Sequence, residues 1–109
     1  RSNFIKQNNM KTVVQKISKT TSVKLNWYNG KIQTVVLSDD ADTEFEFIIL
    51  NKKARPGSQI MLSTLYSGEG VAQVTLVSQE KGSFVVRVSN VGVAAFTRLV
   101  EIGFRIYYS

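Results

Sequence analysis

Apolar and polar residues alternate along most of this chain, which is the pattern of half-buried β-strands. Phe45, Phe47 and Ile49, for instance, alternate with Glu44 and Glu46. The same alternation recurs in further runs: Val23, Leu25 and Trp27; Ile60, Leu62, Thr64 and Tyr66; Ala72, Val74 and Leu76; Phe84, Val86 and Val88; Val100, Ile102, Phe104 and Ile106. No segment has a helical period. The sequence therefore predicts an all-β fold, a single antiparallel β-sandwich of jelly-roll-like type with about seven or eight strands.

Turn residues separate these runs. Asn29-Gly30 is the strongest short hairpin signal in the chain, and it predicts that the run ending at Trp27 pairs with a run through Ile32, Thr34 and Val36. Residues 51–58 contain the single proline, Pro56, and are expected to form a loop. Residues 67–70 and 79–82 are expected to be turns.

Several residue types are absent, and these absences limit the chemistry. The chain of 109 residues has no cysteine and no histidine, so disulfides, thiolate metal sites, ordinary zinc sites and histidine-based triads are excluded. No apolar run approaches the ~18 residues of a membrane helix, and no signal-peptide pattern is present. We expect one soluble, non-enzymatic domain without a cofactor or membrane insertion, and 43% apolar residues suffice for one core.

Charge is distributed unevenly along the chain. The first 38 residues carry seven basic side chains and no acidic one, whereas the remaining 71 carry seven basic and eight acidic ones. The net charge of +6 therefore belongs to the N-terminal third, which we interpret as a basic arm facing an acidic partner. The alternative is that these lysines only solubilise an edge strand.

Some strands carry apolar residues on both faces, although a monomeric sandwich should place polar residues outside. One interpretation is that another copy of the chain covers this outer face; the other is a shifted register or scattered surface apolar residues. The candidate oligomer face comprises Val35, Ile48, Leu50, Val85, Leu99 and Tyr107.

Aromatic and basic residues near the predicted turns are candidate contacts for a ligand or partner. Trp27, Tyr28 and Tyr66 are candidates for a platform on which a sugar or base stacks, although Trp27 ends a core-facing run and is favoured as a core residue. The basic candidates are Lys6, Lys11, Lys16, Lys19, Lys52, Lys53 and Arg55.

An acidic turn contains Asp39, Asp40, Asp42 and Glu44, followed by Glu46. Its spacing is similar to the start of a calcium loop, but the glycine and the distal glutamate of such a loop are missing. We expect this turn to pair with the basic arm, within the chain or across a subunit boundary.

Residues 10–109 resemble a known family. The resemblance rests on Val23-x-Leu25-Asn26-x3-Gly30-x-Ile32-x-Thr34, Phe45-x-Phe47-x3-Asn51, Gly82-Ser83-Phe84-x-Val86-x-Val88-x-Asn90 and Val100-x-Ile102-x-Phe104. Together these patterns are similar to the small β-sandwich virion modules of marine tailed phages, cyanophages in particular. This chain is more basic than those modules. Met10 fits a natural start, which leaves residues 1–9 as an N-terminal extension or an expression remnant.

The resemblance implies a structural virion protein, a capsid decoration, cement or fibre-tip module that forms a homo-oligomer, preferably a trimer, and contacts other virion proteins. The first alternative is a carbohydrate- or receptor-binding module that recognises a host-surface glycan through Trp27, Tyr28 and Tyr66. The second is a β-barrel that binds single-stranded nucleic acid, which the core-facing position of most aromatics disfavours.

Overall fold

The computed structural model describes residues 11–107, and this part of the chain is all-β, with eight strands and no helix. The strands are β1 (Thr12–Val14), β2 (Val23–Lys24), β3 (Asn29–Gln33), β4 (Glu44–Leu50), β5 (Gln59–Leu65), β6 (Ala72–Glu80), β7 (Ser83–Asn90) and β8 (Glu101–Tyr107). The proposed extension of residues 1–9, and Lys6 with it, lies outside the described residues.

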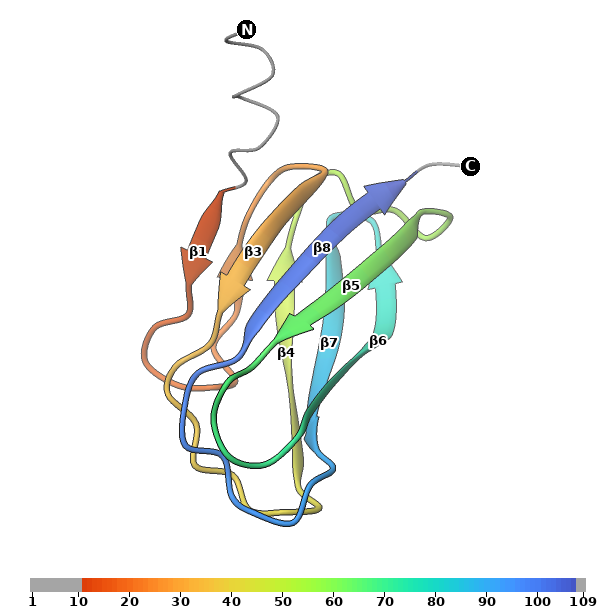
Figure 1. Cartoon of the computed structure of the whole chain (residues 1–109). Helices are drawn as coiled ribbons and strands as arrows, with labels where there is room; N and C mark the ends of the chain where they lie inside the picture. Colours follow the sequence, from red (N-terminus) through yellow and green to blue (C-terminus); the bar gives the residue numbers. More distant parts are fainter. Residues whose placement is uncertain (1–10, 108–109) are drawn as a thin grey trace, which may run out of the picture.

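The strands form two four-stranded sheets that face each other (Figure 1). Sheet A has the strand order β1-β3-β8-β5, and sheet B has the order β2-β4-β7-β6. The prediction of purely antiparallel pairing is wrong, because β1 pairs with β3 and β2 pairs with β4 in parallel. Parallel neighbours need a crossover connection, and here the chain between them passes through the opposite sheet. The arrangement is compatible with a β-sandwich; jelly-roll connectivity stays a prediction.

The predicted hairpin at Asn29-Gly30 is also wrong. Both residues lie inside β3 of sheet A, whereas the preceding strand β2 belongs to sheet B. Neither residue has the positive φ that a type I′ turn requires. Gly30 is buried, and a Cβ there would lie 2.6 Å from Cδ1 of Leu25. The glycine is needed for close packing between the sheets, which a local turn signal cannot reveal.

The tight hairpin of the described chain instead joins β6 to β7. Glu80 pairs with Ser83, which leaves two residues in the turn, and Gly82 there has φ of 89°. Because left-handed backbone favours glycine, Gly82 suits this turn. The predicted turn over residues 79–82 is thus present but narrower than expected, since β6 runs on to Glu80.

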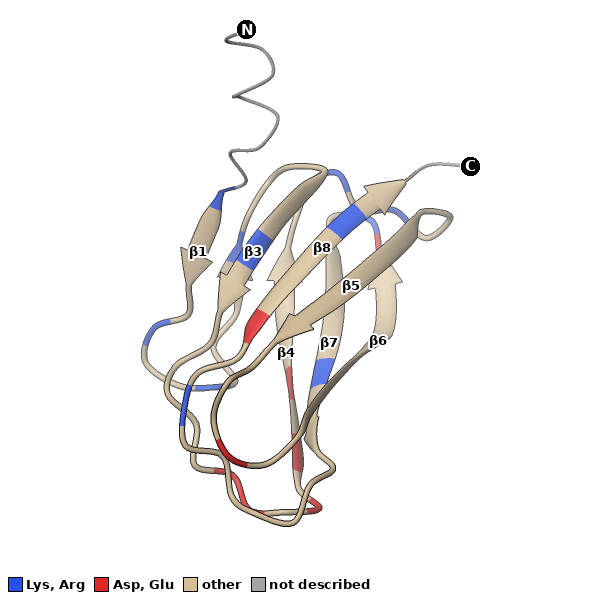
Figure 2. Ribbon diagram, viewed as in Figure 1, with Lys and Arg blue, Asp and Glu red and all other residues tan. Residues whose placement is uncertain are grey.

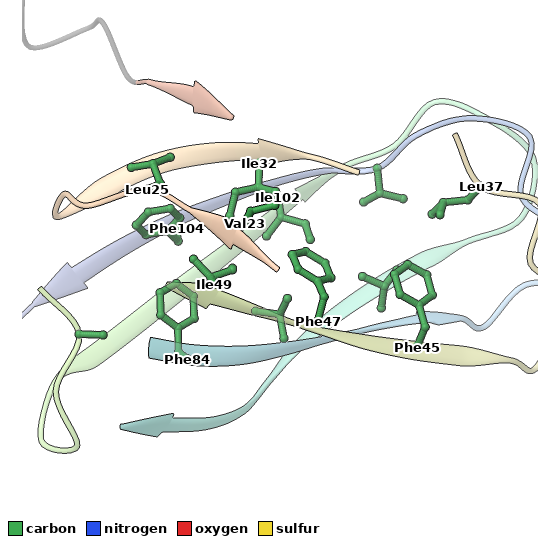
Figure 3. Packing of buried hydrophobic residues seen from close by; sticks show 14 of the residues in the cluster. Val23, Leu25, Ile32, Leu37, Phe45, Phe47, Ile49, Phe84, Ile102 and Phe104 are labelled. Atoms are coloured by element: carbon green, nitrogen blue, oxygen red, sulfur yellow. The ribbon is translucent and has the colours of Figure 1, made fainter. Parts of the chain in front are cut away.

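The predicted alternation decides which side chains form the core. Along β4 and β7 every second residue is buried. In β3 and β8, buried residues likewise alternate with more exposed ones along most of the strand. Phe84 of sheet B and Phe104 of sheet A meet edge to face, with ring centroids 5.5 Å apart. Figure 3 shows this layer between the two sheets, to which Phe45, Phe47 and Ile102 also contribute. Burial of this layer is the main stabilising contribution.

Candidate functional site

The outer face of sheet B carries an apolar patch. Ile48 of β4 lies opposite Val85 of β7, and Leu50 follows on the same face of β4. Strand β6 has a bulge at Val77, because Ser78 pairs with Val85 and Val77 is left as an extra residue without a partner on β7. Val77 therefore lies beside Val85 on this face. Ile48, Leu50 and Val77 are 41%, 43% and 40% exposed. We call Ile48, Leu50, Val77 and Val85 the sheet B patch.

The other residues predicted for the oligomer face lie elsewhere. Val35 packs against the core, and its neighbour Val36 is the exposed residue, at 72%. Leu99 lines a separate hollow with Val36, and Tyr107 lies on β8 of sheet A. The structure therefore brings together three of the six predicted residues and adds Val77, which the period-2 pattern misses because a bulge changes its phase.

An ion pair borders the sheet B patch. Arg87 donates to Oε2 of Glu46 from Nε at 2.9 Å and from a terminal nitrogen at 2.6 Å, and its Nε lies 3.5 Å from Oε2 of Glu44. The hydrogen bond with Glu46, then the negative charges of Glu44 and Glu46, raise the pKa of Arg87 above its usual value. Since this cross-strand pair is exposed, it contributes little to stability but gives the patch a polar border.

Trp27 and Tyr28 lie at one end of the molecule, beside the loop of residues 51–58. Their ring centroids are 5.3 Å apart with an interplanar angle of 68°, so the two rings stand edge to face. Nζ of Lys53 lies 5.8 Å from the centroid of Trp27 and 5.1 Å from that of Tyr28. Trp27 is 52% exposed, so the expectation that it is a core residue is wrong. The chain leaves the core at Leu25, because it must cross from sheet B to sheet A.

Buried Asn51 fixes this end of the molecule. Its side-chain nitrogen donates to the carbonyl of Trp27 at 2.7 Å, and its Oδ1 accepts from the backbone N–H of Lys53 at 2.9 Å. Exposed Asn26 accepts a further hydrogen bond from the N–H of Lys52 at 3.0 Å. Lys52, Lys53 and Arg55 thus belong to a loop held against the aromatic pair, and the prediction that residues 51–58 form a loop is confirmed.

Tyr66 lies at the opposite end of sheet A, after the last residue of β5. Its hydroxyl donates to the carbonyl of Glu69 and accepts from the N–H of Thr97 at 3.0 Å, and its ring packs edge to face on Phe96. Trp27, Tyr28 and Tyr66 therefore do not form one platform.

Charged residues are unevenly distributed over the molecule (Figure 2). Acidic residues gather at the end where β4 begins, and basic residues occupy the loops at the end where β4 finishes. Between the N-terminal segment and the acidic turn, Nζ of Lys19 contacts Oδ2 of Asp39 at 2.7 Å and lies 5.2 Å from the ring centroid of Phe45. Lys11 and Lys16 are exposed. Lys19–Asp39 is the intramolecular pair expected between the basic arm and the acidic turn.

A hollow on the outer face of sheet A is a feature that the sequence interpretation missed. It measures about 460 Å³, and Gly103 lies among the residues that line it, with charged side chains on β3 and β8 around it. The sequence did contain a signal for this hollow, because a glycine inside a strand often marks a site where a ligand or another backbone approaches closely. The alternating pattern drew attention instead to Ile102 and Phe104 on the other face.

Within residues 11–107, no group of three or more acidic side chains is placed to hold a metal ion. The described residues also contain no helix long and apolar enough to cross a membrane. No family model, curated protein or solved structure matches the chain.

Proposed function

We propose that this chain is a non-enzymatic structural module that self-associates through the sheet B patch. The patch itself carries the proposal: Ile48, Leu50, Val77 and Val85 are adjacent, partly exposed and apolar, and charged residues border them. An apolar centre with a polar rim is the usual anatomy of a protein interface. Lys24, which is paired with Leu50, extends that rim on the β2 side.

The biological setting follows from the resemblance to marine phage modules. On that basis we propose a virion protein of a tailed phage, a capsid decoration, cement or fibre-tip module of jelly-roll-like fold. It would assemble as a homo-oligomer, preferably a trimer, and contact other virion proteins. The sequence patterns on which the resemblance rests include Asn51 and Asn90. The side chains of both residues are buried and hydrogen-bonded, at the two ends of sheet B.

Light scattering at micromolar concentration tests self-association. We expect a mass that is a multiple of 12.2 kDa, and a trimer in particular. Val85→Lys and Ile48→Lys should each return the mass to that of one chain, because a buried lysine in the interface would be unpaired. Val36→Lys is the matched control: it is exposed on another part of the molecule and should leave the mass unchanged. A monomeric wild-type protein would refute the proposal.

The virion assignment has a separate test. Peptides of this chain should be found by mass spectrometry in purified particles of the phage that encodes it, and an antibody against the chain should label those particles. Absence of the chain from particles, with the chain present in infected cells, would reject the virion role while leaving self-association standing.

A further inference from the structure

The hollow on sheet A is organised around Gly103. Strand pairing places Lys31 of β3 on one side of Gly103 and Ser63 of β5 on the other, as direct cross-strand neighbours. Because side chains alternate between faces, Glu101 and Arg105 lie on the same outer face as Gly103. The three strands thus present a grid of outward side chains with a gap at its centre.

Gly103 provides the floor of this gap. Directly opposite residues have Cβ atoms ~5 Å apart, so the missing side chain opens a space between Lys31 and Ser63. A Cβ on Gly103 would lie 2.5 Å from Oγ of Ser63, which shows how closely the serine side chain borders the floor. The hollow of about 460 Å³ is within the usual ~300–1,000 Å³ of small-molecule sites.

The polar groups around the floor have both charges. Lys31 and Arg105 both line the hollow, and neither forms an ion pair within residues 11–107. Glu101 lies at the opposite end of the hollow, where Nε2 of Gln33 donates to its Oε1 at 3.1 Å. Figure 2 shows the basic positions side by side on β3 and β8 and the acidic one at the start of β8. By strand register, Arg105 lies toward one end of the hollow, Lys31 lies beside Gly103 at its centre and Glu101 lies toward the other end.

One wall of the hollow is apolar. Met61 and Leu65 of β5 line it and are 62% and 65% exposed, and Tyr107 of β8 lines it at 45% exposure. These residues offer a surface on which the apolar face of a ring can pack.

We propose that this hollow binds a carboxylated saccharide. Lys31 and Arg105 would hold the sugar carboxylate by charge-assisted hydrogen bonds, Ser63 and Glu101 would bind ring hydroxyls, and Met61, Leu65 and Tyr107 would pack against the ring. Glu101 repels a densely charged phosphate chain, which favours a ligand with one carboxylate and several hydroxyls. The proposal goes beyond self-association and is compatible with it, since the sheet B patch lies on the opposite face of the molecule.

Two-dimensional NMR of the ¹⁵N-labelled protein, with galacturonic acid, a sugar with one carboxylate, as the probe, tests the site. We expect saturable shifts of amides along β3, β5 and β8 around Gly103, and much weaker binding of the neutral methyl ester of the same sugar. Arg105→Gln and Lys31→Gln should each weaken binding by about tenfold, the effect of losing one charge-assisted hydrogen bond. Lys81→Gln, at an exposed lysine of the turn between β6 and β7, is the matched control and should bind like the wild type.

A second variant tests the gap together with the Ser63 hydroxyl that borders it. Gly103→Ala combined with Ser63→Ala places a methyl group on the floor and removes the hydroxyl that it would meet. We expect this double variant to keep the wild-type unfolding temperature within a few degrees and to lose binding by about tenfold or more. Equal binding of the acid and its methyl ester, unchanged affinity of Arg105→Gln and Lys31→Gln, or shifts confined to residues 51–55 would overturn the proposal. These results do not depend on the oligomeric mass, so saccharide binding and self-association can each be refuted without the other.

Discussion

The side chain of Asn90 donates a hydrogen bond to the backbone carbonyl of Asp39, 51 positions earlier in the sequence, at 3.1 Å. The same nitrogen donates to the carbonyl of Ala94 at 2.8 Å, and Oδ1 of Asn90 accepts from the N–H groups of Val71 and Gly92 at 3.3 and 3.1 Å. Asn90 is 1% exposed. One buried amide thus joins three loops at the acidic end of the molecule.

Asn90→Ala should therefore destabilise the protein by about 3 kcal/mol, because several buried backbone groups would lose their partner at once. Chemical denaturation followed by tryptophan fluorescence measures the change. Asn26→Ala is the matched control: its exposed amide accepts one hydrogen bond from Lys52, so we expect a loss below about 1 kcal/mol. Equal effects of the two substitutions would contradict the importance of the buried network.

Gly30→Ala should destabilise by about 1–3 kcal/mol through overpacking. The new Cβ would lie 2.6 Å from Cδ1 of Leu25 and 3.2 Å from the ring of Phe104. Leu25→Val in the same chain removes the nearest atom and should restore part of the loss, which thermal unfolding can measure. Gly57→Ala, where a Cβ meets nothing within 4 Å, should be neutral or slightly stabilising. Failure of Leu25→Val to improve Gly30→Ala would argue against a steric cause.

Lys19→Met should cost about 1–2 kcal/mol, because it leaves the Asp39 carboxylate without its ionic partner while retaining the apolar stem of the side chain. The Asp39 side chain is only 6% exposed, so water replaces the lost partner poorly. Lys16→Met, at an exposed position of the same connection, should change stability by less than about 0.5 kcal/mol. Denaturation in urea compares the two variants, and a loss of the same size in both would show that the ion pair is unimportant.

Ile17→Asn should stabilise the protein by about 0.5–1 kcal/mol, although it removes an apolar side chain. Ile17 has φ of 74° and is 94% exposed, so a β-branched residue is held in left-handed backbone without packing in return. Asparagine tolerates that conformation better. Val93→Asn is the control, since Val93 is 99% exposed with no positive φ, and it should give no gain. A lower unfolding temperature for Ile17→Asn would refute this prediction.

Binding of single-stranded nucleic acid should be weak. Trp27 and Tyr28 stand edge to face, Tyr66 lies at the other end of the molecule, and acidic residues cluster there as well. Titration of labelled oligo-dT at two salt concentrations measures this. Submicromolar binding at physiological salt, with a log–log salt slope near 0.7 per neutralised phosphate, would instead place the nucleic-acid function first.

Predictions from the local sequence pattern are confirmed where they concern a single strand and its buried face. The alternation of Phe45, Phe47 and Ile49 correctly identified β4 and its buried face, and the same holds for β7 and β8. The Asn29-Gly30 signal failed because pairing depends on the partner strand: β3 pairs with β8 and β1, not with β2. The candidate sites were predicted only in part for the same reason, since Ile48 and Val85 meet across a strand pair whereas Val35 turns toward the core.

The sequence by itself determined that the chain is all-β and which face of β4, β7 and β8 is buried, because a strand repeats every two residues and the hydrophobic effect selects one face. Only the tertiary structure decided which strands are neighbours, because pairing joins segments that are distant in the chain. It thereby placed Val77 beside Val85 and opened the hollow at Gly103 between Lys31 and Ser63. Both candidate surfaces consist of residues from separate strands, and no single stretch of sequence contains either one.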